Sequence, residues 1–195
     1  MMTTVLLASL ALARPGADAS WEVLDNSPVR IECTEADGKP WCRSIGIIAA
    51  PIDQVASSLE DMASQADVFE AVSQIDVLEA DTFRIVLDFP GMFTDRDYVA
   101  KFSKLEEGDA KVYRWVPVTH PKAPETDETV RLVNMEGEWR LEPMGDQTRA
   151  TYLWEAELMG SFPNWALPTA RKKAGHEALK DLAKSRKAKL SPPPK

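Results

Sequence analysis

The spacing of apolar residues divides this chain into a β-rich body and two helical regions. Over residues 51–65 the apolar side chains recur every three or four positions behind a proline suited to the first turn of a helix, which predicts an amphipathic helix. A second, short helix is predicted over residues 68–73. Elsewhere apolar and polar residues alternate in short runs, which is the period of half-buried strands. The predicted strands cover residues 29–33, 42–49, 82–89, 98–103, 112–118, 130–135, 139–143 and 150–157.

The second helical region covers residues 165–190. Asn164 is available to cap this helix, and Pro168 falls in its first turn, where proline is tolerated. Its apolar stripe is thin, which suits either a helix that leaves room for a ligand or one that packs closely on a sheet. The order of elements predicts an α+β fold with helices over one face of an antiparallel sheet, followed by a disordered, proline-rich tail over residues 191–195. The stripe consists of Leu167, Ala170, Ala174, Ala178, Leu179 and Leu182.

Two cysteines flank a strong turn signal. Asp37-Gly38 is typical of a two-residue hairpin turn. Counting outward from that turn places Cys33 opposite Cys42 in a non-hydrogen-bonded pair, where Cα atoms approach to about 4.5 Å, a separation that a disulfide tolerates. We therefore expect a cross-strand disulfide, with two free thiols in a cytosolic hairpin as the alternative. No histidine lies near the two cysteines in the sequence, so they do not indicate a zinc site.

The N-terminus has the pattern of an export signal. Residues 5–13 form an apolar run far shorter than the roughly 20 residues that a membrane-spanning helix needs. Small residues follow in the A-x-A cleavage pattern at 11–13 and again at 17–19. No Lys or Arg precedes the run, so the alternative is a disordered or membrane-docked stretch of a cytosolic protein. We expect a signal peptide over residues 1–19 and export to the periplasm or the cell exterior.

Charge is unevenly distributed along the chain. The formal net charge is −8, which argues against a nucleic-acid partner. Residues 171–195 hold nine Lys or Arg and two acidic residues, a net charge of +7, which leaves −15 for the first 170 residues. We expect either a transient contact between this basic C-terminal helix and an anionic membrane surface, or a solvated helix face whose cations suit the negative end of the helix dipole.

No motif in the sequence indicates catalysis. His120 lies in a proline-bounded loop and His176 on the last predicted helix, and neither has a Cys or Ser partner in a nucleophile motif. The sequence shows no metal-ligand cluster and no glycine-rich phosphate loop. We therefore expect no enzyme activity, no catalytic residue, no cofactor and no metal, although an acid–base pair dispersed in a pocket would carry no sequence signature.

Four short motifs resemble one known family. Residues 89–99, FPGMFTDRDYV, resemble the proline-to-Arg-Asp-aromatic-Val segment of START domains, the lipid-transfer domains related to steroidogenic acute regulatory protein. Val130-Arg131 and residues 137–139 resemble that family's next two strands, and residues 160–165 resemble its entry into the C-terminal helix. The resemblance implies a START-like domain over residues 20–190 with a helix-grip fold, in which a curved antiparallel sheet wraps a long C-terminal helix around a hydrophobic cavity. It also implies binding and transfer of one apolar ligand, such as a sterol, a phospholipid or a carotenoid.

The alternation and the resemblance together predict the cavity lining. From the sequence alone the same apolar face fits a filled core equally well. Arg131 is the candidate polar anchor if it faces inward, where its charge must be paired, but alternation also allows it to face solvent. Arg96 and Asp97 are expected to hold a loop or strand end more than to touch a ligand. The predicted lining is Phe83, Ile85, Leu87, Tyr98, Phe102, Arg131, Trp139, Tyr152, Trp154, Ala174 and Ala178.

Three functions compete on this evidence. The first is a soluble lipid carrier, which we expect to be a monomer because nothing in the sequence indicates an oligomer. The second is an enzyme of the same superfold, of the aromatic cyclase or dehydratase type, which predicts titratable pocket groups with shifted pKa values. The third is a ligand-free interaction domain, which predicts a filled core and an exposed apolar patch.

Overall fold

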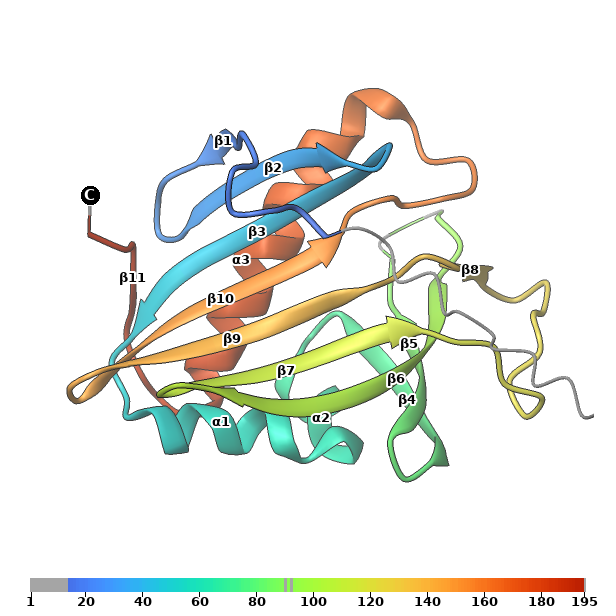
Figure 1. The fold of residues 1–195 in the computed structure, drawn as a ribbon. Helices are drawn as coiled ribbons and strands as arrows, with labels where there is room; N and C mark the ends of the chain where they lie inside the picture. The colour runs from blue at the N-terminus through green and yellow to red at the C-terminus, as the bar shows by residue number, and fades with distance from the viewer. Residues whose placement is uncertain (1–13, 90, 92, 195) are drawn as a thin grey trace, which may run out of the picture.

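The computed structural model describes residues 14–89, 91 and 93–194 (Figure 1). Residues 1–13, which make up most of the expected signal peptide, lie outside the described residues. Within the described ranges, no helix combines the length and the apolar character needed to cross a membrane.

A curved sheet forms most of the described part of the molecule. Its main path runs β1-β2-β3-β10-β9-β7-β6-β5-β4 with antiparallel neighbours, while the short strand β11 pairs with β3 and β8 pairs in parallel with β6. The strands are β1 (Glu22–Asp25), β2 (Arg30–Ala36), β3 (Lys39–Ile48), β4 (Val72–Glu79), β5 (Thr82–Leu87), β6 (Arg96–Glu107), β7 (Ala110–Pro117), β8 (Val130–Arg131), β9 (Gly137–Met144), β10 (Gln147–Glu155) and β11 (Leu190–Ser191).

The helices gather on one side of this sheet. Helix α3 (Leu167–Ser185) runs across its inner face, and α1 (Ile52–Glu60) and α2 (Gln65–Val68) lie along one end (Figure 1). Two 3-10 turns, η1 (Met62–Ser64) and η2 (Asn164–Ala166), precede α2 and α3. The predicted α+β class and helix-grip architecture are therefore confirmed.

The first helical region is shorter than the sequence predicts. Helix α1 ends at Glu60 instead of residue 65, because Asp61 leaves the helical conformation and accepts hydrogen bonds from the amide and hydroxyl of Ser64. The second short helix lies at Gln65–Val68 and not at residues 68–73.

Both ends of the C-terminal helix also differ from the prediction. Asn164 lies in η2 and makes no cap for α3, which starts at Leu167 without a side-chain cap. The helix stops at Ser185 because Lys187 adopts a left-handed φ of 53° while the amides of Lys187 and Ala188 bond back to the last turn, a C-terminal Schellman arrangement. Leu190 and Ser191 then form β11, so the tail predicted to be disordered begins with a residue in a strand.

The strand predicted over residues 130–135 is also mostly absent. Only Val130 and Arg131 pair, with Arg96 and Asp97 of β6. Beyond them Leu132 and Met135 turn into the core, where they are 3% and 7% exposed and where the amide of Met135 bonds to the carbonyl of Leu132.

The two halves of α3 differ in how closely they pack on the sheet. Leu179 and Leu182 are fully buried. At Gly175 a Cβ atom would lie 3.1 Å from side-chain atoms of both Ile31 and Trp154, so the helix backbone packs closely on the sheet here. Ala174, one residue towards the N-terminus, is exposed. From Gly175 onwards α3 therefore packs into the core, whereas its first turns, residues 167–174, contain no buried residue and stand away from the sheet.

The hairpin between β2 and β3 has the predicted register. Ala36 pairs with Lys39, and Cys33 pairs with Cys42, with a Cα–Cα distance of 4.1 Å. The predicted disulfide joins the two cysteines. It ties the β2–β3 hairpin at a point where Cys42 is fully buried.

We expect the double variant Cys33→Ala/Cys42→Ala to lose about 2–3 kcal/mol of unfolding free energy, because a disulfide that closes so short a loop restricts the unfolded chain by about that much. Urea denaturation measures the loss. Reducing the wild-type protein should produce a similar decrease. A decrease below about 0.5 kcal/mol in both experiments would contradict the assignment.

Candidate ligand-binding cavity

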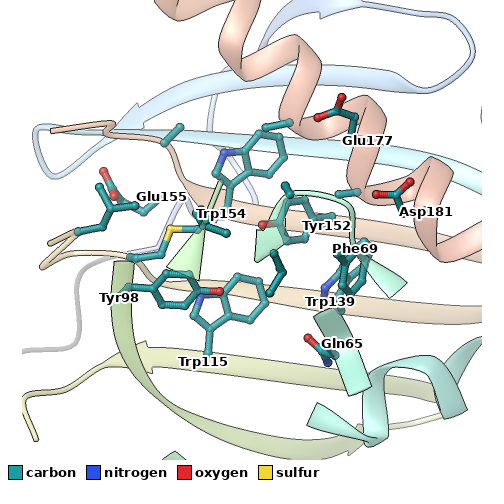
Figure 2. A pocket seen from close by; sticks show the side chains of 18 of the residues that line it. Gln65, Phe69, Tyr98, Trp115, Trp139, Tyr152, Trp154, Glu155, Glu177 and Asp181 are labelled. Carbon is teal, nitrogen blue, oxygen red and sulfur yellow. The ribbon is translucent and has the colours of Figure 1, made fainter. Parts of the chain in front are cut away.

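A cavity of about 970 Å³ lies between the inner face of the sheet and α3 (Figure 2). Strands β5, β6, β7, β9 and β10 supply its floor, the α1–α2 region closes one end, and the N-terminal half of α3 forms its roof. This volume lies at the upper end of the range of small-molecule pockets. The inner face of the sheet is therefore not a completely filled core.

Most of the lining residues predicted from the sequence lie on the cavity wall. The sheet contributes its inward-facing positions, and α3 contributes two of its small residues. The predicted residues found there are Phe83, Leu87, Tyr98, Phe102, Trp139, Tyr152, Trp154, Ala174 and Ala178.

Ile85 is on the inner face but does not reach the cavity. It is 2% exposed and belongs to the main hydrophobic core. In the sheet it pairs with Ile75 of β4 and Tyr98 of β6 and is not among the residues that line the cavity. Its assignment to the cavity lining was therefore wrong.

Arg131, the predicted polar anchor, also lies outside the cavity. Its guanidinium donates to both oxygens of Asp97, at 3.0 and 2.8 Å, and Arg84 donates to the same carboxylate at 2.6 Å. The Asp97 side chain is 1% exposed. Burial raises the pKa of this carboxyl group, but the hydrogen bonds from Arg131 and Arg84 outweigh that effect and hold the pKa below its ordinary value. Arg131 therefore stabilises a buried carboxylate instead of facing a ligand.

Arg96 holds the loop before β6 against the segment before α3. It is 2% exposed and donates to the carbonyl oxygens of Thr94 and Met159. Its guanidinium also lies 4.4 Å from the centre of the Phe89 ring and 5.8 Å from that of Phe162, within cation–π range. This geometry fits the structural role expected for Arg96.

A row of aromatic rings covers the cavity floor (Figure 2). Tyr152 of β10 lies at its centre, with ring centroids 4.5 Å from Trp139, 4.8 Å from Trp154 and 5.9 Å from Trp115. The row continues from Trp115 to Phe102, again at 5.9 Å. Rings at these separations gain stabilisation beyond the area that they bury.

The sequence analysis did not name Trp115 as a lining residue. It is 3% exposed and lines the cavity from β7. Alternation within the predicted strand 112–118 puts it on the same face as Tyr113, so the sequence pattern could have identified it as an inward-facing residue. Opposite Trp115, a Cβ atom on Gly137 would lie 2.1 Å from the indole ring, so the glycine leaves the space that the ring occupies.

Two charged residues in the cavity wall were also missed. Glu155, the last residue of β10, is 2% exposed, and burial raises its pKa to about 7. Arg171, on the first turns of α3, lines the same cavity, and burial lowers the pKa of its guanidinium. In the sequence pattern both residues stand at positions expected to face solvent. Only the three-dimensional arrangement therefore identifies them as cavity residues.

A second buried carboxylate lies at the opposite end of the cavity from Glu155 (Figure 2). Asp181 of α3 is 2% exposed, and burial raises its pKa. One carboxylate oxygen accepts a hydrogen bond from the Glu70 amide at 3.0 Å, which joins α3 to the segment between α2 and β4. Asp181 therefore has a structural partner on one side.

Two tyrosines, Tyr98 and Tyr152, line the cavity. Burial raises the pKa values of Tyr98 and Tyr152, and the neighbouring Tyr152 adds to the rise at Tyr98. Neither tyrosine ionises at neutral pH, so both act as neutral aromatic surfaces that carry a hydroxyl group.

The mouth of the cavity is aromatic. Phe89, Phe93 and Phe162 line it, and the rings of Phe93 and Phe162 are 5.1 Å apart. Trp165 also lines it, just before α3, and is 84% exposed. The cavity wall therefore reaches the protein surface at Trp165.

The histidines lie away from the cavity. His120 Nε2 is 3.3 Å from a Glu79 carboxylate oxygen, and His176 Nε2 is 3.2 Å from one of Asp25. Within the described part of the chain, no group of three or more His, Cys, Asp or Glu side chains could hold a metal ion.

Comparison with known proteins identifies the fold. No protein-family model matches the chain. An uncharacterized protein of Pseudomonas aeruginosa is 26% identical over 172 residues, which are 84% of this chain and 85% of that protein. Human StAR-related lipid transfer protein 5 superposes with a TM-score of 0.79 at 17% identity, covering 87% of this chain and 88% of that one. The chain has the helix-grip fold of START domains.

Two further solved structures show the range of this fold. A STAR-related lipid transfer protein of Xanthomonas axonopodis has a TM-score of 0.72 at 22% identity, covering 86% of this chain and 98% of that one. The ZhuI aromatase/cyclase of a Streptomyces species has a TM-score of 0.53 at 17% identity, covering 75% of this chain and 93% of that one. The fold is thus found both in lipid-transfer proteins and in an enzyme.

Proposed function

We propose that this protein binds one lipid-like molecule in the cavity beneath α3 and carries it unchanged through an aqueous compartment. The observation that carries the proposal is the cavity of about 970 Å³, whose floor is a continuous row of aromatic side chains. Moving apolar surface from water into such a site is favourable by about 25 cal/mol per Å². The likeness of the fold to two lipid-transfer proteins supports the same function.

Native mass spectrometry of the protein purified from its own host tests this proposal. We expect a monomer with one bound molecule of defined mass, and lipid extraction of the same sample should release that molecule. A protein that is empty, and that stays empty after incubation with sterols, phospholipids and carotenoids, would count against the proposal.

An enzyme of the aromatic cyclase or dehydratase type is the second candidate, because one observation favours it. Glu155 lies in the cavity wall with its pKa raised to about 7, a value that suits an acid or base at neutral pH. The two functions differ in the fate of the bound molecule. Recovering the ligand with an unchanged mass after prolonged incubation supports the carrier, and a loss of water or a new ring supports the enzyme.

We also propose that the protein is exported. The Cys33–Cys42 disulfide supports this, because such bonds persist in oxidising compartments.

Arg14 supports cleavage of the signal peptide after residue 13 over cleavage after residue 19. Its guanidinium pairs at 2.6 Å with Glu136, whose side chain is 3% exposed, and the later cleavage would leave that buried carboxylate without this partner. The intact mass of the mature protein should therefore correspond to a chain that starts at Arg14; one that starts at Ser20 would contradict this assignment.

Transient membrane contact would occur at the cavity mouth under this proposal. Trp165 is 84% exposed there, and tryptophan favours the membrane–water interface. Lys173, also at the mouth and largely exposed, adds a cation that suits anionic lipid. Trp165→Ala should slow ligand transfer to vesicles containing phosphatidylglycerol by a larger factor than it weakens ligand binding, which is measured in parallel. Equal transfer rates would contradict this contact.

A further inference from the structure

Glu155 and Arg171 are two charged residues that line the same cavity without pairing directly. Glu155 comes from the end of β10 and Arg171 from α3, so they approach the cavity from the sheet and from the roof. The charge of each side chain shifts the pKa of the other, yet no direct ion pair joins them. Glu155 is 2% exposed, whereas Arg171 is half-buried with a buried Nε. A charge held out of water without a partner is costly, so the buried Glu155 carboxylate favours a third group between the two side chains.

Each side chain keeps hydrogen-bonding capacity that the described residues leave unused. One oxygen of Glu155 accepts a hydrogen bond from the amide of Glu157 at 3.0 Å, and no described side chain donates to the other oxygen. On Arg171 the buried Nε has no partner among the described residues, and no side chain of the described residues forms an ion pair with the guanidinium. The nearby charges of Glu157 and Lys39 are engaged with each other at 2.9 Å. An acceptor and a donor are therefore both available to a ligand.

This pair of side chains selects among polar groups by chemistry. A ligand carboxylate would be attracted by Arg171 but repelled by Glu155 wherever the pH ionises that carboxyl group, and a ligand ammonium group would be repelled by Arg171 and attracted by ionised Glu155. A hydroxyl group can donate to the Glu155 carboxylate and accept from the Arg171 guanidinium at the same time. An ether oxygen can only accept, so it would leave the carboxylate unpaired.

We propose that Glu155 and Arg171 form a polar anchor that binds the hydroxyl group of an otherwise apolar lipid, an inference that rests on the proposed lipid-binding function. The aromatic floor then holds the apolar body of the ligand, with Trp154 beside Glu155 and Tyr152 next in the row (Figure 2). The raised pKa of Glu155, about 7, agrees with a carboxyl group that lacks a permanent partner in the empty protein.

Competition between two probes of equal chain length tests the anchor. 1-Tetradecanol and methyl tetradecyl ether are supplied together from cyclodextrin, and native mass spectrometry measures the ratio of the two complexes. Hydrogen bonds to charged groups contribute enough to predict roughly a 10-fold or greater preference of the wild-type protein for the alcohol.

Three variants assign that preference to the two residues. Glu155→Gln keeps the shape of the side chain and should reduce the preference, and Glu155→Leu should reduce it to within about twofold. Arg171→Met should weaken alcohol binding roughly 10-fold, because the donor is lost. Arg149→Met removes a guanidinium from the same strand β10 outside the cavity, so it should bind both probes as the wild type does.

The outcomes separate the anchor from the carrier function. If the wild type binds both probes equally, or if Glu155→Gln and Glu155→Leu keep the full preference, the anchor is wrong and the carrier function stands. If the wild type binds neither probe, the anchor is wrong, and the incubation with sterols, phospholipids and carotenoids decides separately on the carrier function. Thermal unfolding of each variant shows that a lost preference does not come from a lost fold.

Discussion

Replacing Asp97 by alanine is expected to lower the free energy of unfolding by about 3–5 kcal/mol, the loss typical when one partner of a buried ion pair is removed. Asp97 is 1% exposed and accepts from Arg84 and Arg131, whose side chains are only 17% and 10% exposed. Without the carboxylate, two positive charges remain close together and mostly out of water. Because Arg131 belongs to β8 and Asp97 to β6, the variant should also release the short β8 strand. Urea denaturation followed by circular dichroism measures the change.

Asp76→Ala is the matched control for this prediction. Asp76 also pairs with Arg84, at 3.1 Å, but its side chain is 37% exposed. An ion pair so accessible to solvent contributes at most about 1 kcal/mol. If the Asp97 and Asp76 variants lost the same small amount of unfolding free energy, the Arg84–Asp97–Arg131 cluster would not be the stabilising feature that its geometry indicates.

The same carboxylate predicts an acid-dependent loss of stability. The folded-state pKa of Asp97 lies below its ordinary value of 3.8, so folding favours the ionised form. This contribution is fully present above the unfolded-state pKa and disappears as the pH falls towards the lower pKa of the folded state. A plot of unfolding free energy against pH should therefore be less steep below pH 4 for Asp97→Asn than for the wild type.

Features set by local chain geometry could be predicted from the sequence. The β2–β3 hairpin is an example, because the Asp37-Gly38 turn fixes the register residue by residue and so determines which residue lies opposite Cys33. The inward-facing aromatic residues followed in the same way from a period of two. These predictions depend on neighbours along the chain or directly across one turn.

Features that depend on packing between distant elements could not be predicted. Arg131 has the same pattern whether it faces a cavity or a buried carboxylate, and only the parallel pairing of β8 with β6 decides between them. Glu155 and Arg171 look like ordinary surface residues in the sequence. They become cavity residues because β10 ends beneath the part of α3 that stands away from the sheet. The separation between that part of α3 and the sheet cannot be deduced from a local sequence pattern.

Filling the cavity should abolish ligand binding while leaving the fold intact. Ala174 lines the cavity from the middle of α3, and its side chain has open space in front of it. The indole of Ala174→Trp would occupy the volume that a ligand needs, so we expect lipid affinity to fall by roughly 100-fold or more, as for a site whose buried apolar area is lost. Unfolding free energy should be unchanged or slightly higher, because the new side chain fills existing space. Lys180→Trp adds the same side chain to an exposed position of α3 outside the cavity and should bind ligand normally. Equal binding by the two variants would mean that the ligand does not lie beneath α3, and normal affinity in Lys180→Trp with loss in Ala174→Trp would place it there.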